Sequence, residues 1–97
     1  MLFIEGLCPH CEAGQVGFRR CSDGVTLVLM CDECDFAWLE PERRTLDDSV
    51  FPDMHTFEIP GTTLAVGGGS AGWATRAEVE RAGWAVYVAG ERPTPSS

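Results

Sequence analysis

The chain contains no lysine and no asparagine, and arginine supplies all seven of its basic residues. Fifteen aspartates and glutamates oppose them, which gives a formal net charge of −8. Proteins that bind the nucleic-acid backbone need clustered positive charge, so this balance argues against general nucleic-acid binding. The chain also lacks an apolar run near the roughly 18 residues that a membrane span requires, and we expect no membrane insertion.

A secretory leader is not predicted either. Residues 1–4 are apolar, but Glu5 interrupts them and no basic segment precedes them. We therefore expect a cytoplasmic protein, in which paired cysteines serve as metal ligands or redox groups rather than structural disulfides. The missing lysine and asparagine, together with abundant glycine and alanine, suggest a GC-rich genome and a bacterial source.

Cysteine is the residue that the chain does have in excess. A chain of 97 residues gains only marginal stability from burial, and its five cysteines are the obvious candidates for a staple. Four of them form two C-x2-C pairs that are separated by 19 residues. Each pair lets one tight turn aim two sulfurs at one ion, and two such turns complete a tetrahedron of thiolates. Because four protein ligands exclude water, we expect one structural Zn²⁺ ion bound by Cys8, Cys11, Cys31 and Cys34.

The residues around these pairs predict a hairpin that brings the two turns together. Residues 15–20 can be extended, residues 22–24 carry a Ser-Asp-Gly turn signal, and residues 25–30 are apolar and β-branched. Residues 36–39 are typical of a third strand. This order of cysteine turn (knuckle), strand, turn, strand, knuckle and strand resembles the zinc ribbon superfamily over residues 5–40. The resemblance implies a metal and an architecture, but zinc ribbons occur in transcription factors, ribosomal proteins, enzyme subunits and protein-binding adaptors.

One departure from the ribbon pattern concerns the residue after each pair. Many ribbon knuckles have glycine there, where the backbone turns left-handed, but this chain has Glu12 and Asp35. Aspartate tolerates that conformation better than glutamate does. We therefore expect the first knuckle to turn later, at Gly14.

A redox interpretation competes with the metal site. The Cys-Pro-His-Cys tetrapeptide at residues 8–11 resembles the active site of oxidising thioredoxin-like proteins. Only seven residues precede it, and Gly14 and Gly17 weaken the helix that should follow. The second pair would also go unexplained, so we favour the metal site.

Two further residues have both a structural and a chemical interpretation. His10 is a potential substitute ligand, but four thiols already complete the shell, and we expect it to lie exposed on its knuckle. Cys21 is expected to pack as a small hydrophobic residue at a strand end. The alternative for Cys21 is an accessible, reactive thiol favoured by Arg19 and Arg20.

The second half of the chain is expected to frame the ribbon. Residues 43–72 are rich in loop signals, with short strands expected at 56–59 and 62–66 and a helical turn starting at Thr45. Thr75 and Glu78 form a capping-box sequence that predicts a helix over residues 76–82, ended by Gly83. A strand is expected over residues 84–88.

Together these signals predict a small α+β fold in one compact domain. Its parts are a three-stranded zinc ribbon (1–42), a loop-rich connection (43–72), a helix-strand unit (73–90) and a disordered tail (91–97). The ribbon strands are apolar on both faces, so something must cover the second face. We expect the helix-strand unit to do so with Trp73 and Trp84.

Charge offers the best indication of a partner. Acidic residues gather around and beyond the second knuckle: Asp32, Glu33, Asp35, Glu40, Glu42, Asp47, Asp48 and Asp53. They are either a solvated surface or a patch that steers toward a basic protein. We expect a non-enzymatic structural-zinc protein that acts as an acidic protein–protein interaction module, in its sharpest form an inhibitor or immunity-type protein.

Two other functions stay open at this point. A nucleic-acid-associated zinc-ribbon factor in transcription or translation would need Arg19, Arg20, Arg43 and Arg44 on one face. A CxxC thiol redox protein would need accessible thiolates.

Overall fold

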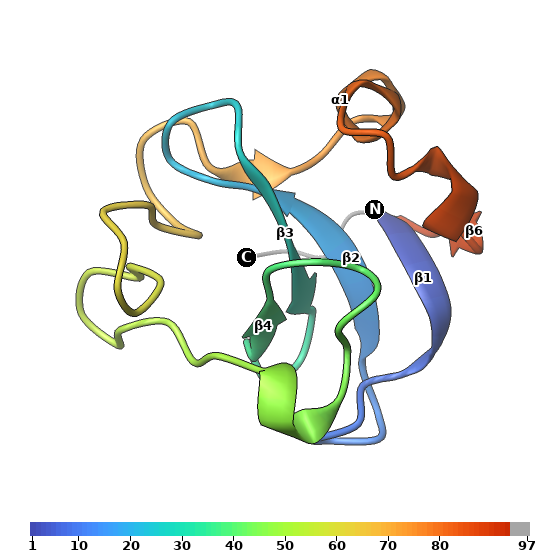
Figure 1. Cartoon of the computed structure of the whole chain (residues 1–97), viewed down its shortest axis with the longest axis horizontal. Helices are drawn as coiled ribbons and strands as arrows, with labels where there is room; N and C mark the ends of the chain where they lie inside the picture. The colour runs from blue at the N-terminus through green and yellow to red at the C-terminus, as the bar shows by residue number, and fades with distance from the viewer. Residues whose placement is uncertain (94–97) are drawn as a thin grey trace.

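A computed structural model describes residues 1–93 as an antiparallel sheet of six strands with little helix (Figure 1). The strands are β1 (Leu2–Leu7), β2 (Gln15–Arg20), β3 (Leu27–Cys31), β4 (Ala37–Trp38), β5 (Gly72–Trp73) and β6 (Gly90–Glu91). Five of them follow the order β4-β3-β2-β1-β6, and β5 pairs with the end of β2 that β1 leaves open. The helical segments are η1 (Leu46–Asp48), α1 (Arg76–Arg81) and η2 (Ala85–Tyr87).

The hairpin of β2 and β3 is the centre of the sheet. Its pairing runs without a break from Val16 opposite Cys31 to Arg20 opposite Leu27. Asp23 shapes the turn between the strands, because its carboxylate accepts hydrogen bonds from the backbone N–H groups two and three residues later. This register brings the end of β3 beside the start of β2, so the second cysteine pair lies next to the first.

Strand β3 is buried on both faces. Leu27, Leu29 and Cys31 belong to one hydrophobic core, whereas Val28 and Met30 belong to a second core on the opposite face. The alternation follows from the two-residue period of a strand. The prediction that both faces of this strand are covered is confirmed.

The two cores have different covers, which lie on either side of the sheet (Figure 1). The segment of α1 and η2 covers the first core through Val79 and Trp84. The second core is covered by the connection, through Ile59 and Val66, and by Trp73. The C-terminal unit therefore covers one face of the sheet with Trp84, as predicted, but Trp73 does not join it there. Trp73 precedes Ala74, which faces the first core, and so lies on the second.

Helix α1 begins at Arg76, as predicted, and ends at Arg81, one residue before the predicted end, with Ala82 as its C-cap. The Thr75 hydroxyl accepts a hydrogen bond from the Glu78 backbone N–H, and the Glu78 carboxylate accepts one from the Thr75 N–H. Gly83, with φ +79°, follows the C-cap. The helical turn predicted to start at Thr45 is also present, as η1.

The strand predicted over residues 84–88 is wrong, since these residues form the 3-10 turn η2. The Tyr87 N–H donates to the Trp84 carbonyl and the Val88 N–H to the Ala85 carbonyl, so local bonds replace a strand ladder. The outer edge of β1 is instead occupied by β6, whose Glu91 lies opposite Leu2.

Three other differences concern the ends and the connection. Strand β1 adds a strand before the first knuckle that the three-stranded prediction lacked. The tail was predicted to be disordered from residue 91, but its described part is ordered. Glu91 lies in β6, and the Arg92 N–H donates to the Met1 carbonyl. Residues 94–97 lie outside the described residues. The two short strands predicted in the connection are reduced to a single bridge between Glu58 and Ala65.

Candidate metal centre

The sulfurs of Cys8, Cys11, Cys31 and Cys34 lie within 4.8 Å of one another. Two of the separations are 3.6 Å, between Cys8 and Cys34, and 3.7 Å, between Cys11 and Cys31. A tetrahedral site with metal–sulfur bonds of about 2.3 Å places its sulfurs about 3.8 Å apart. The four cysteines are therefore gathered at a spacing that fits one metal ion.

Each pair of sulfurs is presented by a tight turn. The first turn joins β1 to β2 and is closed by hydrogen bonds from the Cys8 N–H to the Gly14 carbonyl and from the Glu12 N–H to the Cys8 carbonyl. In the second turn, between β3 and β4, the Cys31 N–H donates to the Phe36 carbonyl. In both turns, backbone hydrogen bonds hold the two cysteines of a C-x2-C pair close together.

Both knuckles turn left-handed directly after their second cysteine. Glu12 has φ 55° and Asp35 has φ 65°. The prediction that the first knuckle turns later, at Gly14, is therefore wrong. Both knuckles have the same backbone geometry, and the hydrogen bond from the Glu12 N–H to the Cys8 carbonyl holds Glu12 in a conformation that glutamate tolerates poorly.

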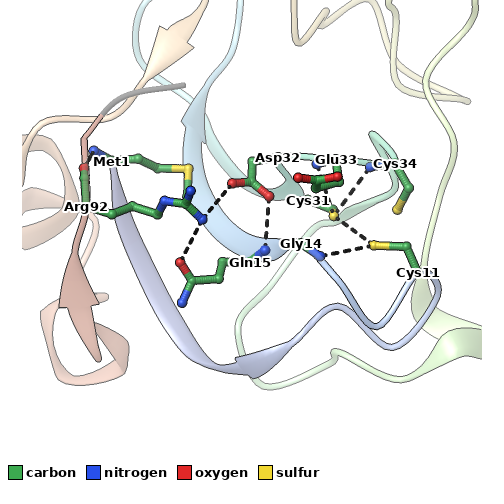
Figure 2. Close-up of polar contacts among 9 residues, drawn as sticks. All are labelled: Met1, Cys11, Gly14, Gln15, Cys31, Asp32, Glu33, Cys34 and Arg92. Atoms are coloured by element: carbon green, nitrogen blue, oxygen red, sulfur yellow. Dashed lines mark hydrogen bonds and ion pairs between the residues drawn. The ribbon is translucent and has the colours of Figure 1, made fainter. Parts of the chain in front are cut away.

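Gly14 has a different role, which is to let the knuckles approach. A Cβ at this position would lie 2.7 Å from the Cys31 sulfur and also 2.7 Å from side-chain atoms of Asp32 and Glu33. No residue with a side chain fits there without moving the second knuckle. Its N–H donates to the Cys11 sulfur at 3.3 Å (Figure 2).

Backbone N–H groups also point at the Cys31 sulfur, and Figure 2 shows the contact from Cys34. The N–H groups of Glu33 and Cys34 lie 3.4 and 3.5 Å from its sulfur. Hydrogen bonds of this kind favour the thiolate, the form of cysteine that binds metals.

The thiols respond differently to this environment. Hydrogen bonds from the Gly14 and then the Ala13 backbone lower the pKa of Cys11 to about 7. Burial raises the pKa of Cys31 and of Cys34. Burial disfavours the negative thiolates that a metal site needs. A bound cation would take the place of the thiol protons and compensate the negative charge of the thiolates.

Asp32 is a structural acid beside the cluster rather than part of an open acidic surface. Its carboxylate accepts a hydrogen bond from the Gln15 N–H at 3.0 Å and pairs with Arg92 at 3.2 Å, and only 4% of its side chain is exposed. Arg92 also donates to the Gln15 side chain (Figure 2). Arg92 of the C-terminal segment therefore links the second knuckle to β2. The sequence did not indicate this link.

An aromatic cluster joins the two knuckles on their outer side. His10 lies exposed on its knuckle, and its ring stacks on Phe36 with centroids 3.7 Å apart. Its Nε2 lies 2.7 Å from the Ser49 hydroxyl, while Phe51 meets Phe36 edge-on. His10 is thus placed as a contact between knuckles, apart from the cluster of sulfurs.

Cys21 lies away from the four clustered cysteines. It is fully buried in the second core, and burial raises the pKa of its thiol to about 11. The prediction that it packs as a small hydrophobic residue is confirmed.

Over residues 1–93, no helix has the length and apolar character that crossing a membrane requires. No family model matches the chain, and no solved structure matches it. It is similar to an uncharacterized protein of Acanthamoeba polyphaga mimivirus, with 24% identity over 87 residues that cover 84% of this chain and 72% of the relative. This relative is viral, so it lends no support to the predicted bacterial source.

Proposed function

We propose that the chain is a non-enzymatic zinc-ribbon protein whose metal is structural and whose acidic surface binds another protein. The observation that carries the proposal is the closed set of four thiols, whose two knuckles carry exposed carboxylates at Glu12, Glu33 and Asp35. Four protein ligands leave no position for a substrate or a reactive water, so the metal would stabilise the fold rather than catalyse a reaction.

Zinc is the ion that this donor set supports best. Thiolate ligands in a tetrahedron suit Zn²⁺ or iron among common metals. The ribbon resemblance favours Zn²⁺, and the metallated protein would be more acidic still, since four thiolates and one divalent ion add two negative charges to the formal −8.

Redox catalysis by the first pair is less well supported. Reactive C-x2-C cysteines draw their low pKa from a helix N-terminus. Here Cys11 is followed by a turn and then by β2, and its pKa is lowered by turn N–H groups that also suit a metal ligand.

A nucleic-acid interface is also poorly supported, because three of the four candidate arginines are engaged within the protein and only Arg43 lies exposed without a side-chain contact among the described residues. Arg20 pairs with Glu78 at 2.8 Å, Arg19 donates to the Val66 carbonyl, and Arg44 donates to the Pro41 carbonyl. Side chains held in this way are not gathered to meet a phosphate backbone.

The acidic surface points instead to a basic protein partner. Of the acids around the second knuckle and η1, six are exposed: Glu33, Asp35, Glu40, Glu42, Asp47 and Asp53. Complementary charge speeds association and makes binding sensitive to salt. An inhibitor or immunity-type role against a basic protein is the sharpest form of this proposal.

The proposal is tested by purifying the untagged, zinc-loaded protein from its own host at low salt. A co-purifying basic protein that dissociates as the salt concentration rises, and that rebinds after dialysis, is the expected result. Recovery of nucleic acid alone would overturn the protein-binding function and favour the transcription or translation factor.

A further inference from the structure

A groove of about 620 Å³ lies between the second knuckle and the connection. The second knuckle contributes Asp32 and Asp35 to its lining, and the connection contributes a wall that includes Phe51, Pro52, Asp53, Met54 and Phe57. Met30 of β3 and Trp73 of β5 also line it. The groove therefore lies on the face of the sheet that the connection covers only in part.

The wall formed by the connection is unusually apolar for a surface. Met54 is 79% exposed, Phe57 51% and Phe51 42%, and all three line the groove. Single exposed apolar residues are common, but several that meet around one hollow mark an interaction site.

Phe57 is held in this wall against its own backbone preference. Its φ of 61° lies in the left-handed region, which is a genuine outlier for a bulky residue. Hydrogen bonds from the Phe57 N–H to the Asp53 carbonyl and from the Val66 N–H to the Phe57 carbonyl fix it there. Its ring packs over Gly67, where a Cβ would lie 3.2 Å from the ring.

Folding alone gives no reason to keep a phenylalanine at this position. Glycine or asparagine adopts the left-handed region with less strain, and about half of the surface of Phe57 stays exposed to water. Strained residues of this kind cluster at binding sites. The strain and the exposure of Phe57 therefore point to a ring that is presented to a partner.

The charges of the groove indicate what that partner carries. Asp35 and Asp53 are exposed in the lining. Asp53 accepts hydrogen bonds from the backbone N–H groups of His55 and Thr56 and keeps its negative charge. Asp32 pairs with Arg92, and the Arg19 guanidinium donates to the Val66 carbonyl and lies 4.9 Å from the centre of the Trp73 ring. An incoming group would meet the two exposed carboxylates, which attract cations and repel anions.

We infer that this groove docks a positively charged segment of a partner protein, with one bulky apolar side chain inserted against Met54, Phe57 and Trp73 and flanking arginines or lysines beside Asp35 and Asp53. The inference rests on the proposed protein-binding function and gives it a site. Apolar contact supplies affinity at the centre, and the carboxylates supply orientation and salt dependence at the rim.

The test uses NMR titration of the isotope-labelled, zinc-loaded protein. The probe is a capped peptide with one tryptophan flanked on each side by two arginines. Matched peptides replace the tryptophan by alanine or the arginines by glutamates. We expect saturable shifts at the Trp73 indole, the Met30 and Met54 methyl groups and the Gly67 amide, with binding weakened at least tenfold for either matched peptide.

Variants separate contact from folding. Met54→Ser removes a side chain that is largely exposed, so it should keep the fold and weaken peptide binding several-fold. Val25→Ser is the matched control, because Val25 is equally exposed at 79% and does not line the groove. The double change Asp35→Asn and Asp53→Asn should reduce both the affinity and its salt dependence, whereas Asp47→Asn should change neither.

The outcomes distinguish this inference from the function on which it rests. If the peptide shifts only residues around Glu40 and Asp47, or if Met54→Ser and Val25→Ser bind it equally, the groove is not the docking site, although a protein-binding role survives. If a basic partner is recovered from the host and its complex leaves the groove signals unchanged, the inference is likewise overturned. Failure to recover any protein partner would instead overturn the function itself.

Discussion

At the scale of single residues, the two knuckles depend on backbone geometry that ordinary side chains oppose. Glu12 and Asp35 both take the left-handed conformation, which costs about 1 kcal/mol for a residue other than glycine. Gly14 then leaves room for the Cys31 sulfur at the place where a side chain would lie. The ligands are therefore positioned by their neighbours as much as by the C-x2-C spacing.

The role of Gly14 is tested by Gly14→Ala. The added Cβ would push against the Cys31 sulfur, and we expect zinc affinity to fall by about 10-fold to 100-fold, as changes beside metal ligands commonly cause. Competition with a chromophoric chelator measures this affinity.

Gly61→Ala is the matched control for Gly14→Ala. Gly61 has φ +80° and open space around its Cα, so alanine there should cost about 1 kcal/mol of stability without changing zinc affinity. Equal zinc affinity for Gly14→Ala and the unaltered protein would contradict the close approach of the two knuckles.

Cys21 should behave as a core residue. Because it is fully buried and its pKa is raised to about 11, a thiol reagent at neutral pH should leave it unmodified in the folded, zinc-loaded protein. Cys21→Ala should keep one zinc per chain and lower the free energy of unfolding by about 1 kcal/mol.

Cys8→Ala is the control for Cys21→Ala, since Cys8 is equally buried but lies in the metal cluster. It should lose the zinc. Rapid modification of a single thiol that disappears in Cys21→Ala would show that Cys21 is accessible after all.

Among the elements, local signals in the sequence were enough to predict those that are stabilised by their own residues. Strand β2 has the predicted bounds Gln15–Arg20, and α1 has the predicted capping box. The C-x2-C pairs identified the four clustered cysteines for the same reason, since each pair belongs to one turn.

Elements that depend on a distant partner could not be predicted in this way. Residues 84–88 have the alternation of a strand, but β1 offers its edge to Gly90–Glu91, which carry no strand preference of their own. The connection also supplies Ile59 and Val66 to the second core, although proline and glycine punctuate its sequence. The ion pair between Asp32 and Arg92 joins residues that are 60 positions apart, so no local pattern in the sequence predicts it.

The start of α1 gives a prediction for pH dependence. Hydrogen bonding to the Thr75 N–H, and then the pairing with Arg20, hold the pKa of Glu78 below its ordinary value of 4.5. A lowered pKa means that the ionised carboxylate stabilises the fold above pH 4.5, and that this contribution is lost as the pH falls below 4.5.

Glu78→Gln should therefore lower the free energy of unfolding by about 1 kcal/mol at pH 6, and the difference from the unaltered protein should shrink as the pH falls through 4.5. Urea unfolding with excess zinc measures the difference at each pH. Glu80→Gln, on the exposed side of the same helix, should show no such trend. A difference that stays constant over the acidic range in which both proteins remain zinc-loaded and folded would contradict the assignment.

At the scale of the whole molecule, three devices hold a short chain together. The connection covers one face of the sheet, the segment of α1 and η2 covers the other, and the cysteine cluster joins the ends of the central hairpin. A domain of this size has a small core, so a bound metal would supply a large part of its stability. The proposed docking groove lies between two of these devices, the second knuckle and the connection.

One zinc ion, held by Cys8, Cys11, Cys31 and Cys34, is proposed to stabilise this fold. Native mass spectrometry of the untagged protein, before and after chelation, tests this role when circular dichroism is recorded on the same samples. We predict one zinc per chain, and loss of the folded signal when the zinc is removed. A protein that carries no metal, with Cys8 and Cys11 oxidised to a disulfide and the fold intact, would contradict a structural zinc site and favour redox chemistry at the first pair.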